Sequence, residues 1–451
     1  MDPITESLLA IKGDQQERLN RYALNWAFYK GEQYMHEMGM EYVKEHKLFK
    51  EMRKVFGFVT QTVDTDARLV MKRQLRIKAE KENFADDIYD IWERSNIQAE
   101  KYKLVRYGAN LGDAYLIVQD LSDGIGKVVP RIIVANSEDM YVEQDPDDQT
   151  NVLWARQSYT FIDERNVPHT RDWLYWPDRV ERYTDYKMDE GYPISHPFNE
   201  VPVIHIKTLD IGEKWGLCSW HNVQSQIDYV NELGSFANKI MLRYADPTLV
   251  GVGISPGTSI PIRRGINSDN IYYLSNPESD LRILEYQGNV LPQMMDMIKE
   301  ISANIKDQLP ELSLTKLRDS SQLSGYAVSL HLADLIAKVE ELRGNFANGI
   351  EWANSLCLRA LKRSDAPLEE FENHVVYEDI LPEDLQLKLT SYGQMLAMRI
   401  ESRKGILLRQ GLTEEEAEAK LQEIDEEAMA DYDTFFLQNR EAEAEEEEEE
   451  E

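Results

Sequence analysis

Gly126 and Lys127 form the one Gly-Lys pair of the sequence, and such a pair could close a phosphate-binding loop. That loop also needs a glycine five positions earlier and a serine or threonine directly after the lysine, because backbone amides cradle the phosphates and the hydroxyl binds Mg²⁺. Leu121 and Val128 occupy these two positions. The sequence therefore lacks this signature of a nucleotide-driven motor.

Other residues with chemical potential also lack the spacing that their chemistry needs. The stretch DPDDQT from Asp145 starts like a calcium loop, but its sixth position is not glycine, and Arg156 replaces the bidentate glutamate. We interpret this stretch as a β-turn. The glycines of 251–257 do not follow the dinucleotide-binding pattern, and Ser324 does not lie in a nucleophile elbow.

Three of the eight histidines, His205, His221 and His331, lie singly, without the spacing of metal ligands. We therefore expect no metal, no cofactor and no catalytic residue, and we interpret the protein as a non-enzyme. A hydrolase is the third choice, because no nucleophile–base arrangement supports it. Cys218 and Cys357 lie in apolar periodic segments, so we expect two buried thiols rather than a disulfide.

The chain is strongly acidic, with a formal net charge of −32 at pH 7. Residues 411–451 carry 19 acidic and 2 basic side chains, and 441–451 are an acidic low-complexity tail that cannot bury a core. This charge argues against tight, sequence-specific DNA recognition. The N-terminal residues lack the apolar run of a signal peptide, and no stretch reaches the roughly 18 apolar residues that span a bilayer. We expect a soluble protein made in the cytoplasm.

The periodicity of apolar residues predicts several long helices around a β-rich middle. Residues 1–55 and 84–107 have helical spacing, the latter as one amphipathic helix. A stripe from Ser219 predicts a helix that ends near Ala245, because the residue before Pro247 is pushed out of the helical region. Pro292 opens another helix, which Pro310 ends. A third long helix reaches about residue 363, and its two glycines, Gly344 and Gly349, are possible bends.

The middle of the chain changes to the period of two that is typical of strands. A hairpin is predicted at 113–135, and further strands are predicted at 140–143, 152–161, 173–176, 179–184 and 201–207, with a short one at 374–377. Strands followed by helices indicate an α+β fold that is mainly helical.

Five segments, in this order, resemble the portal (head-to-tail connector) proteins of tailed bacteriophages. Each segment alone is degenerate, and the ordered set carries the resemblance; at 196–204, Asn199-Glu200 replaces a glycine that is common in the family. The segments are FGFVTQTVDT at 56–65, YGANLGDAYLIV at 107–118, HPFNEVPVI at 196–204, SGYAVSL at 324–330 and VYEDILPED at 376–384.

The resemblance implies the arrangement of a portal subunit, with an α+β wing, long stem helices, a small β-rich clip and a helical crown. The implied divisions are the wing at 1–218, stem helices at 219–246 and 292–309, the clip at 247–291, the tunnel loop at 310–324, the long helix and return to the wing at 325–381, the crown at 382–440 and the acidic tail at 441–451.

The resemblance also implies a function: a ring at one capsid vertex of the virion, through which double-stranded DNA is packaged and later ejected. The implied partners are eleven further copies in a homo-dodecamer, double-stranded DNA, the terminase large subunit, the major capsid and scaffolding proteins, and head-completion or neck proteins. No membrane partner is implied. The stem stripe, which comprises Ile227, Val230, Ile298, Ile301 and Ile305, should be buried between elements or subunits.

Two groups of site residues follow from the same resemblance. The tunnel loop would contact DNA through Lys316, Arg318, Ser313 and Thr315, with both cations as weak phosphate contacts on an otherwise repulsive wall. The clip would face the motor through Arg263, Arg264 and Arg282. An ordinary solvated loop is the alternative for the first group.

The alternative function is an acidic cytoplasmic scaffold or adaptor that binds basic partners. Ring formation separates it from a portal, because a scaffold should be a monomer or a small oligomer in solution.

Overall fold

The structure is a computed structural model of the whole chain, and it divides into two compact units, Met1–Ile380 and Leu381–Glu451. The described part of the second unit consists of short helices at 392–397, Arg403–Arg409 (α13) and 417–426. The described residues are 7–10, 13–34, 55–79, 81–121, 128–245, 249–252, 280–283, 290–313, 332–364, 366–378, 380, 392–409, 417–426 and 429.

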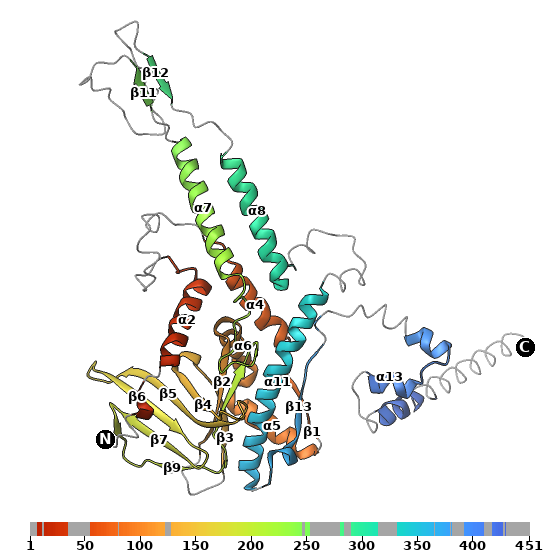
Figure 1. Cartoon of the computed structure of the whole chain (residues 1–451). Helices are drawn as coiled ribbons and strands as arrows, with labels where there is room; N and C mark the ends of the chain where they lie inside the picture. The colour runs from red at the N-terminus through yellow and green to blue at the C-terminus, as the bar shows by residue number, and fades with distance from the viewer. Residues whose placement is uncertain are drawn as a thin grey trace, which may run out of the picture. The chain divides into compact units, whose positions relative to one another are not determined.

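Two antiparallel sheets form the β-rich middle of the first unit (Figure 1). The smaller sheet places β2 between β10 and β3, and the pairing of β2 with β3 confirms the predicted hairpin. The larger sheet is a meander in which each strand pairs with its predecessor, and β9 pairs with β7. The strands are β2 (Asp113–Asp120), β3 (Pro130–Ala135), β4 (Met140–Gln144), β5 (Val152–Ile162), β6 (Pro168–Tyr175), β7 (Arg179–Thr184), β8 (Lys187–Met188), β9 (Ile194–Ser195) and β10 (Val203–Lys207).

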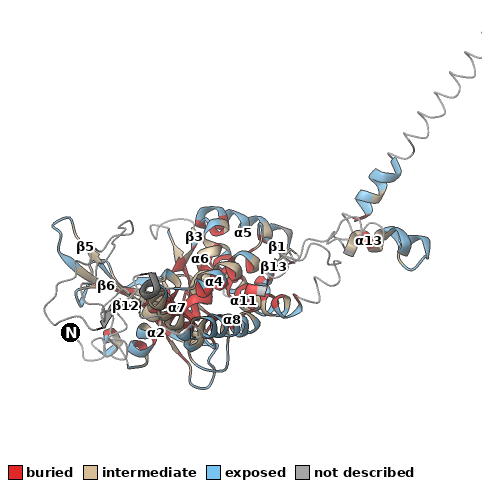
Figure 2. Cartoon of the chain, turned by 90° about the horizontal axis from the view of Figure 1, so that it is seen from above, coloured by how far each residue is buried: buried red, intermediate tan, exposed pale blue. Residues whose placement is uncertain are grey.

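Helices pack against the smaller sheet, where β2 is buried along most of its length. Figure 2 shows buried residues gathered where α4, α6, α7 and α11 meet. A two-stranded pair, β1 with β13, joins the segment between α4 and α5 to the segment after α11. The elements are α2 (Gly13–Lys30), α4 (Phe58–Val70), β1 (Arg76–Ala79), α5 (Glu82–Ser95), α6 (Ile97–Leu111), the 3₁₀ turn η2 (Ser137–Asp139), α11 (Ala333–Lys362), η4 (Leu368–Phe371) and β13 (Asn373–Val376).

The predicted single helix over 84–107 is wrong. Asn96 adopts the left-handed conformation, with φ of 53°, and separates α5 from α6. Asparagine tolerates this conformation better than other non-glycine residues, and the apolar spacing continues through the break. The two helices can therefore each bury an apolar face against a different part of the core, although the spacing of apolar residues predicts a single helix.

Two helices, α7 (Gln224–Ala245) and α8 (Val290–Gln308), lie side by side and correspond to the expected stem helices (Figure 1). Between them in the chain, β11 (Leu249–Val252) pairs with β12 (Asp280–Ile283). The helix α7 starts later than Ser219, because residues up to 223 form turns that bury Trp220. The stripe residues Ile227, Val230, Ile298 and Ile305 are buried between elements, as expected, and Ile301 is partly buried.

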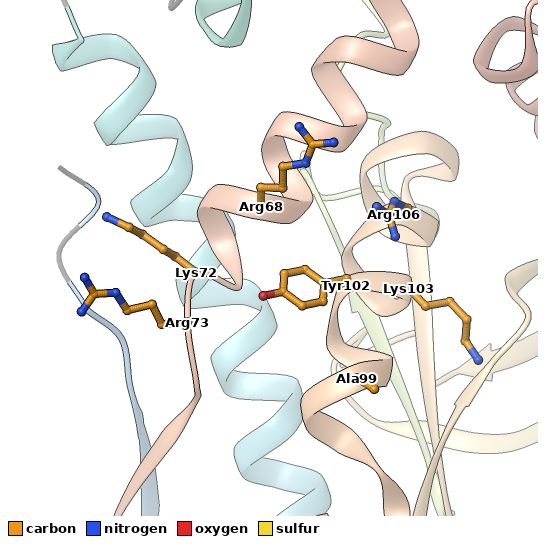
Figure 3. A pocket seen from close by; sticks show the side chains of 7 residues that line it. All are labelled: Arg68, Lys72, Arg73, Ala99, Tyr102, Lys103 and Arg106. Atoms are coloured by element: carbon orange, nitrogen blue, oxygen red, sulfur yellow. The ribbon is translucent and has the colours of Figure 1, made fainter. Parts of the chain in front are cut away.

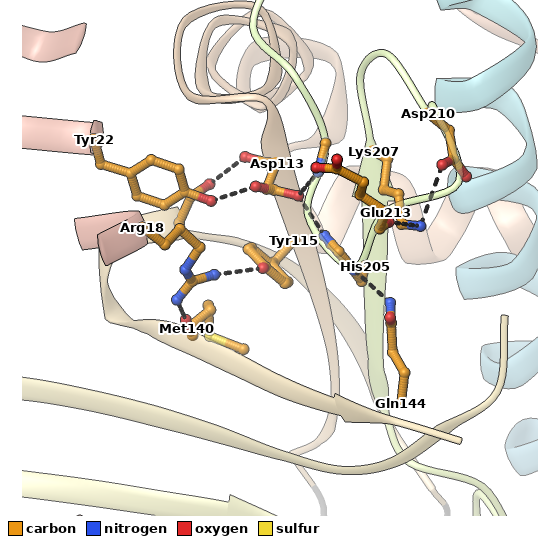
Figure 4. A network of polar contacts seen from close by, with 12 residues as sticks. Arg18, Tyr22, Asp113, Tyr115, Met140, Gln144, His205, Lys207, Asp210 and Glu213 are labelled. Atoms are coloured by element: carbon orange, nitrogen blue, oxygen red, sulfur yellow. Dashed lines mark hydrogen bonds and ion pairs between the residues drawn. The ribbon is translucent and has the colours of Figure 1, made fainter. Parts of the chain in front are cut away.

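A buried carboxylate, Asp113, connects segments that are far apart in the sequence (Figure 4). Its oxygens accept hydrogen bonds from the Tyr22 hydroxyl at 2.5 Å, from His205 Nε2 at 2.7 Å and from the Gly216 amide at 2.8 Å. The preceding Gly112 has φ of 99°, and a Cβ there would lie 2.3 Å from the Gly216 carbonyl oxygen. This close backbone approach explains why a glycine precedes the strand.

Burial alone would raise the pKa of the Asp113 carboxyl, but the hydrogen bonds from His205, Tyr22 and Gly216 outweigh it and lower the pKa below 3.8. The carboxylate is therefore ionised in the folded protein. Around it, Arg18 donates to the Tyr115 hydroxyl at 2.9 Å and to the Met140 carbonyl. The network ties α2 to both sheets.

Glycine 349 brings α11 close to the smaller sheet. A Cβ at this position would lie 2.4 Å from Cδ1 and Cγ1 of the buried Ile206, whereas a Cβ at Gly344 would meet nothing within 4 Å. The helix is continuous through both residues. Close packing against Ile206 explains the second glycine, and a bend at either glycine stays a prediction.

Replacing Asp113 with asparagine should lower the free energy of unfolding at pH 7 by about 3 kcal/mol. The NH₂ group of asparagine would face a hydrogen-bond donor where the carboxylate oxygen now accepts, and the buried network would lose its negative charge. The lowered pKa means that the carboxylate stabilises above pH 3.8, and that this stabilisation is lost as the pH falls through the folded-state value. Urea denaturation should show the difference narrowing below that pH. Asp178→Asn, with a side chain 70% exposed, is the control; an equal loss there would refute the special role of Asp113.

The two helix glycines give a matched pair of alanine variants. Gly344→Ala should raise the free energy of unfolding by about 0.5–1 kcal/mol, because alanine is the better helix former. Gly349→Ala should lower it by about 1–3 kcal/mol, because the methyl group overpacks Ile206. Thermal or urea denaturation measures both, and stabilisation by both changes would show that the sheet yields without cost.

Candidate functional site

The root of the expected tunnel loop is built around buried charges. After α8, the short 3₁₀ segment η3 (Pro310–Ser313) packs on α4 and α8, with Leu309 and Leu312 in the core. Glu311 of η3 is fully buried and forms an ion pair with Lys338 of α11. The same ammonium donates to the Ser219 carbonyl at 3.2 Å.

A second buried carboxyl, Asp66 of α4, belongs to this charge cluster at the loop root. Burial raises the pKa of Asp66 well above 3.8; Lys338 opposes this rise, and the negative Glu311 adds to it. Burial opposes the charge on Lys338, but Asp66 and Glu311 outweigh that effect and raise its pKa. The buried carboxyl of Asp66 is therefore harder to ionise than that of a free aspartate, and the charged form of Lys338 is stabilised by the two carboxyl groups beside it.

The predicted site residues lie mostly outside the described residues. This holds for Thr315, Lys316, Arg318, Arg263 and Arg264. Ser313 ends η3, and Arg282 lies in β12 opposite Val250, so the structure locates these two by backbone alone. Their proposed roles in contacting DNA and the motor therefore remain predictions.

The stem helices leave apolar side chains in contact with solvent. Tyr229, Met295 and Met297 are each more than 40% exposed. A hollow of about 610 Å³ between α7 and α8 is lined by Tyr229, Met297 and Ile301, among others. Exposed apolar side chains on two adjacent helices are typical of a surface that packs against another protein.

A second hollow, of about 520 Å³, lies on the surface of α4 and α6 (Figure 3). We call it the basic hollow, and its lining consists of Arg68, Lys72, Arg73, Ala99, Tyr102, Lys103 and Arg106. Five of the seven lining residues are cations, and none is acidic, in a chain with 82 acidic and 50 basic side chains.

Sequence reasoning missed both the basic hollow and the buried charges at the loop root. Lys103 and Arg106 share a face of α6, and Arg68, Lys72 and Arg73 cluster around the C-terminal end of α4, so the local signal is two short cationic groups. That these groups face one hollow depends on the packing of α4 against α6. Asp66 lies more than 200 residues before Glu311 and Lys338, so no local sequence pattern connects the three.

The described residues contain no cluster of three or more histidine, cysteine or acidic side chains that could hold a metal ion. His205 is engaged with Asp113. The stretch from Asp145 forms a turn in which the Asn151 amide donates to the Asp148 carbonyl at 3.0 Å, which is the backbone hydrogen bond of a β-turn. Both cysteines are buried and free. No helix within the described ranges is both long and apolar enough to cross a bilayer.

Comparison with known proteins gives both a family and a fold. The family model described as phage portal protein, SPP1 Gp6-like, matches residues 8–431. No curated protein matches the sequence.

Two solved structures share the fold of this chain. One is a chain in the neck of an empty gene transfer agent (GTA) particle computed with C6 symmetry, with 15% identity and a TM-score of 0.50; the match covers 81% of this chain and 93% of that one. The other is a chain in the neck of a native GTA particle computed with C12 symmetry, with 14% identity and a TM-score of 0.50, covering 83% and 94%.

These findings confirm the expected mainly helical α+β fold and the resemblance on which the expected function depends. They do not favour the alternative of an acidic scaffold or adaptor. The family is a structural class of head-to-tail connectors in the virion, located at a capsid vertex. Because the family model covers nearly the whole chain, the protein belongs to the phage portal protein family, SPP1 Gp6-like.

Proposed function

We propose that about twelve copies of the chain close into a ring at one capsid vertex, through which double-stranded DNA is packaged and later ejected. The single observation that carries this proposal is the family match over residues 8–431. The number is supported by the similar chain in a neck computed with C12 symmetry, and closure by the rule that soluble homo-oligomers favour closed symmetry.

The surface of the stem supports packing between copies. Tyr229 of α7 and Met297 of α8 are exposed on helices whose other faces are already buried in the core cluster. In a ring, the next copy would cover these side chains and remove apolar area from water. The stem stripe is buried mostly within one chain, so the exposed face that carries Tyr229 and Met297 is the one available for assembly.

The tunnel loop would supply the contacts to DNA. Lys316 and Arg318, with Ser313 and Thr315, would meet phosphates transiently, since each exposed contact contributes about 1 kcal/mol or less at physiological salt. The buried Glu311–Lys338 pair and Leu312 would fix the point where this loop leaves the core. A loop that is fixed at this end and carries two cations further along would suit a segment that steadies DNA without binding it tightly.

The remaining partners would meet the clip and the rim of the ring. Arg263, Arg264 and Arg282 would face the terminase large subunit during packaging and head-completion or neck proteins afterwards. The major capsid and scaffolding proteins would surround the ring. In this arrangement the energy for transport comes from the terminase, and the protein itself acts without catalysis.

The first test is the state of assembly of the purified protein. Negative-stain imaging and native mass spectrometry should show closed rings of about twelve copies, because the stem leaves apolar area for a neighbour to cover. A monodisperse monomer at high concentration would exclude the proposed function.

The second test concerns the loop. Lys316→Ala with Arg318→Ala should leave rings and thermal stability unchanged, and should lower packaging yield or retention of packaged DNA, because only weak phosphate contacts are lost. Arg165→Ala with Lys187→Ala, two exposed cations of the larger sheet, is the matched control. Equal packaging by both double variants would remove the role assigned to the loop.

The loop root gives a prediction on pH. Because the folded-state pKa of Asp66 is raised, the folded protein binds more protons than the unfolded chain above pH 3.8, and stability falls as the pH rises toward that raised value. Asp66→Asn removes this loss, so at pH 8 the variant should be more stable than the natural protein. At pH 5 the difference in stability should be smaller. Urea denaturation at both pH values tests this, with the exposed Glu300→Gln as control; parallel pH profiles of the natural protein and the Asp66 variant would contradict a raised pKa of Asp66.

A further inference from the structure

The basic hollow gathers cations from two parts of the fold. Arg68 lies in the last turn of α4, Lys72 and Arg73 directly follow that helix, and Lys103 and Arg106 lie on α6. Figure 3 shows these side chains arranged around Tyr102. The arrangement concentrates positive charge in a molecule whose net charge is −32.

Contacts within the chain hold the cations in place without filling the hollow. Arg106 Nε lies 2.9 Å from Asp64 Oδ1, and Arg73 lies 2.7 Å from Glu378. The side chains of Arg68 and Arg73 are nevertheless 71% and 68% exposed, and that of Lys103 is 43% exposed. Carboxylates are thus the groups that these guanidinium ions already bind, and exposed area remains for more of them.

Ring assembly creates a need for such a surface. Copies that each carry a charge of −32 repel one another. A ring of more than two copies uses a heterologous interface, in which one face of each copy meets a different face of the next. Opposite charges on these two faces lower the repulsion and set the register.

We propose that the basic hollow receives an acidic surface of the adjacent copy of this chain. This inference rests on the proposed ring and specifies one of its contacts. An acidic protein surface is favoured over DNA for two reasons: carboxylates already pair with the cations around the hollow, and a hollow of about 520 Å³ suits a few side chains rather than a duplex.

Charge reversal at two exposed positions tests the inference. Arg68→Glu with Lys103→Glu should raise the concentration at which rings dissociate by at least about tenfold, because attraction is replaced by repulsion in the interface. The reversal Arg165→Glu with Lys187→Glu changes the net charge equally on the larger sheet and should leave assembly unchanged. Mass photometry measures the ring fraction, and circular dichroism with thermal unfolding reports on the fold. If the reversal variant misfolds, Arg68→Gln with Lys103→Gln should show a smaller rise of the same sign.

Zero-length cross-linking then identifies the partner. Rings assembled from ¹⁴N and ¹⁵N chains and treated with a carbodiimide should yield peptides that join Lys72 or Lys103 of one isotope to a carboxylate of the other. Intact rings in which these lysines link only within one isotope would overturn the inference and leave the proposed function standing. Failure of the natural protein to form rings would instead refute the proposed function.

Nucleic acid is the competing occupant. Rings that survive charge reversal but bind a 30-base-pair duplex more weakly, as measured by fluorescence anisotropy, would show that the hollow meets phosphates and would overturn the inference. Unchanged assembly and unchanged DNA binding would overturn it as well.

Discussion

The buried charge of Asp113 is the constraint on which the rest of the first unit depends. A carboxylate in an apolar interior is tolerated only with donors on its oxygens, and here the donors come from α2, β10 and the turn before α7. Satisfying one charge therefore fixes the relative positions of a helix, a sheet and the segment that leads into the stem. The backbones of Gly112 and Gly216 lie so close at this junction that neither position has room for a side chain.

Much of the fold could be predicted from the sequence because the relevant signals are local. The periodicity of apolar residues predicts the strands of both sheets and the apolar stripe through Ile227 and Ile305. In the structure these strands form and these stripe residues are buried. The break at Asn96 was missed because its backbone conformation leaves the spacing of apolar residues intact. The cluster of Asp66, Glu311 and Lys338 could not be predicted, because three distant elements have to pack before these charges meet. The roles of the tunnel-loop and clip residues remain proposals that rest on family membership, because most of these residues lie outside the described ranges.

Negative charge has opposite consequences for the two tasks of a portal. A channel wall that repels phosphates lets DNA move without adhering, whereas the same charge opposes the association of copies. In the proposed ring, the cations gathered on α4, on α6 and just after α4 would meet both demands at an unchanged net charge. The charge therefore has to be judged by its distribution over the subunit, and the composition alone would have suggested only a soluble acidic protein.

The contact between Gly349 and Ile206 has a consequence for how the parts of the first unit are joined. With no side chain between them, α11 lies directly on the smaller sheet, and its 30 residues span about 45 Å. Along this length the helix carries Lys338, which pairs with Glu311 of η3, and Asn354, which bonds to Trp92 and Asn373 near the β1–β13 pair. One helix is therefore the common support of η3, the smaller sheet and the β1–β13 pair.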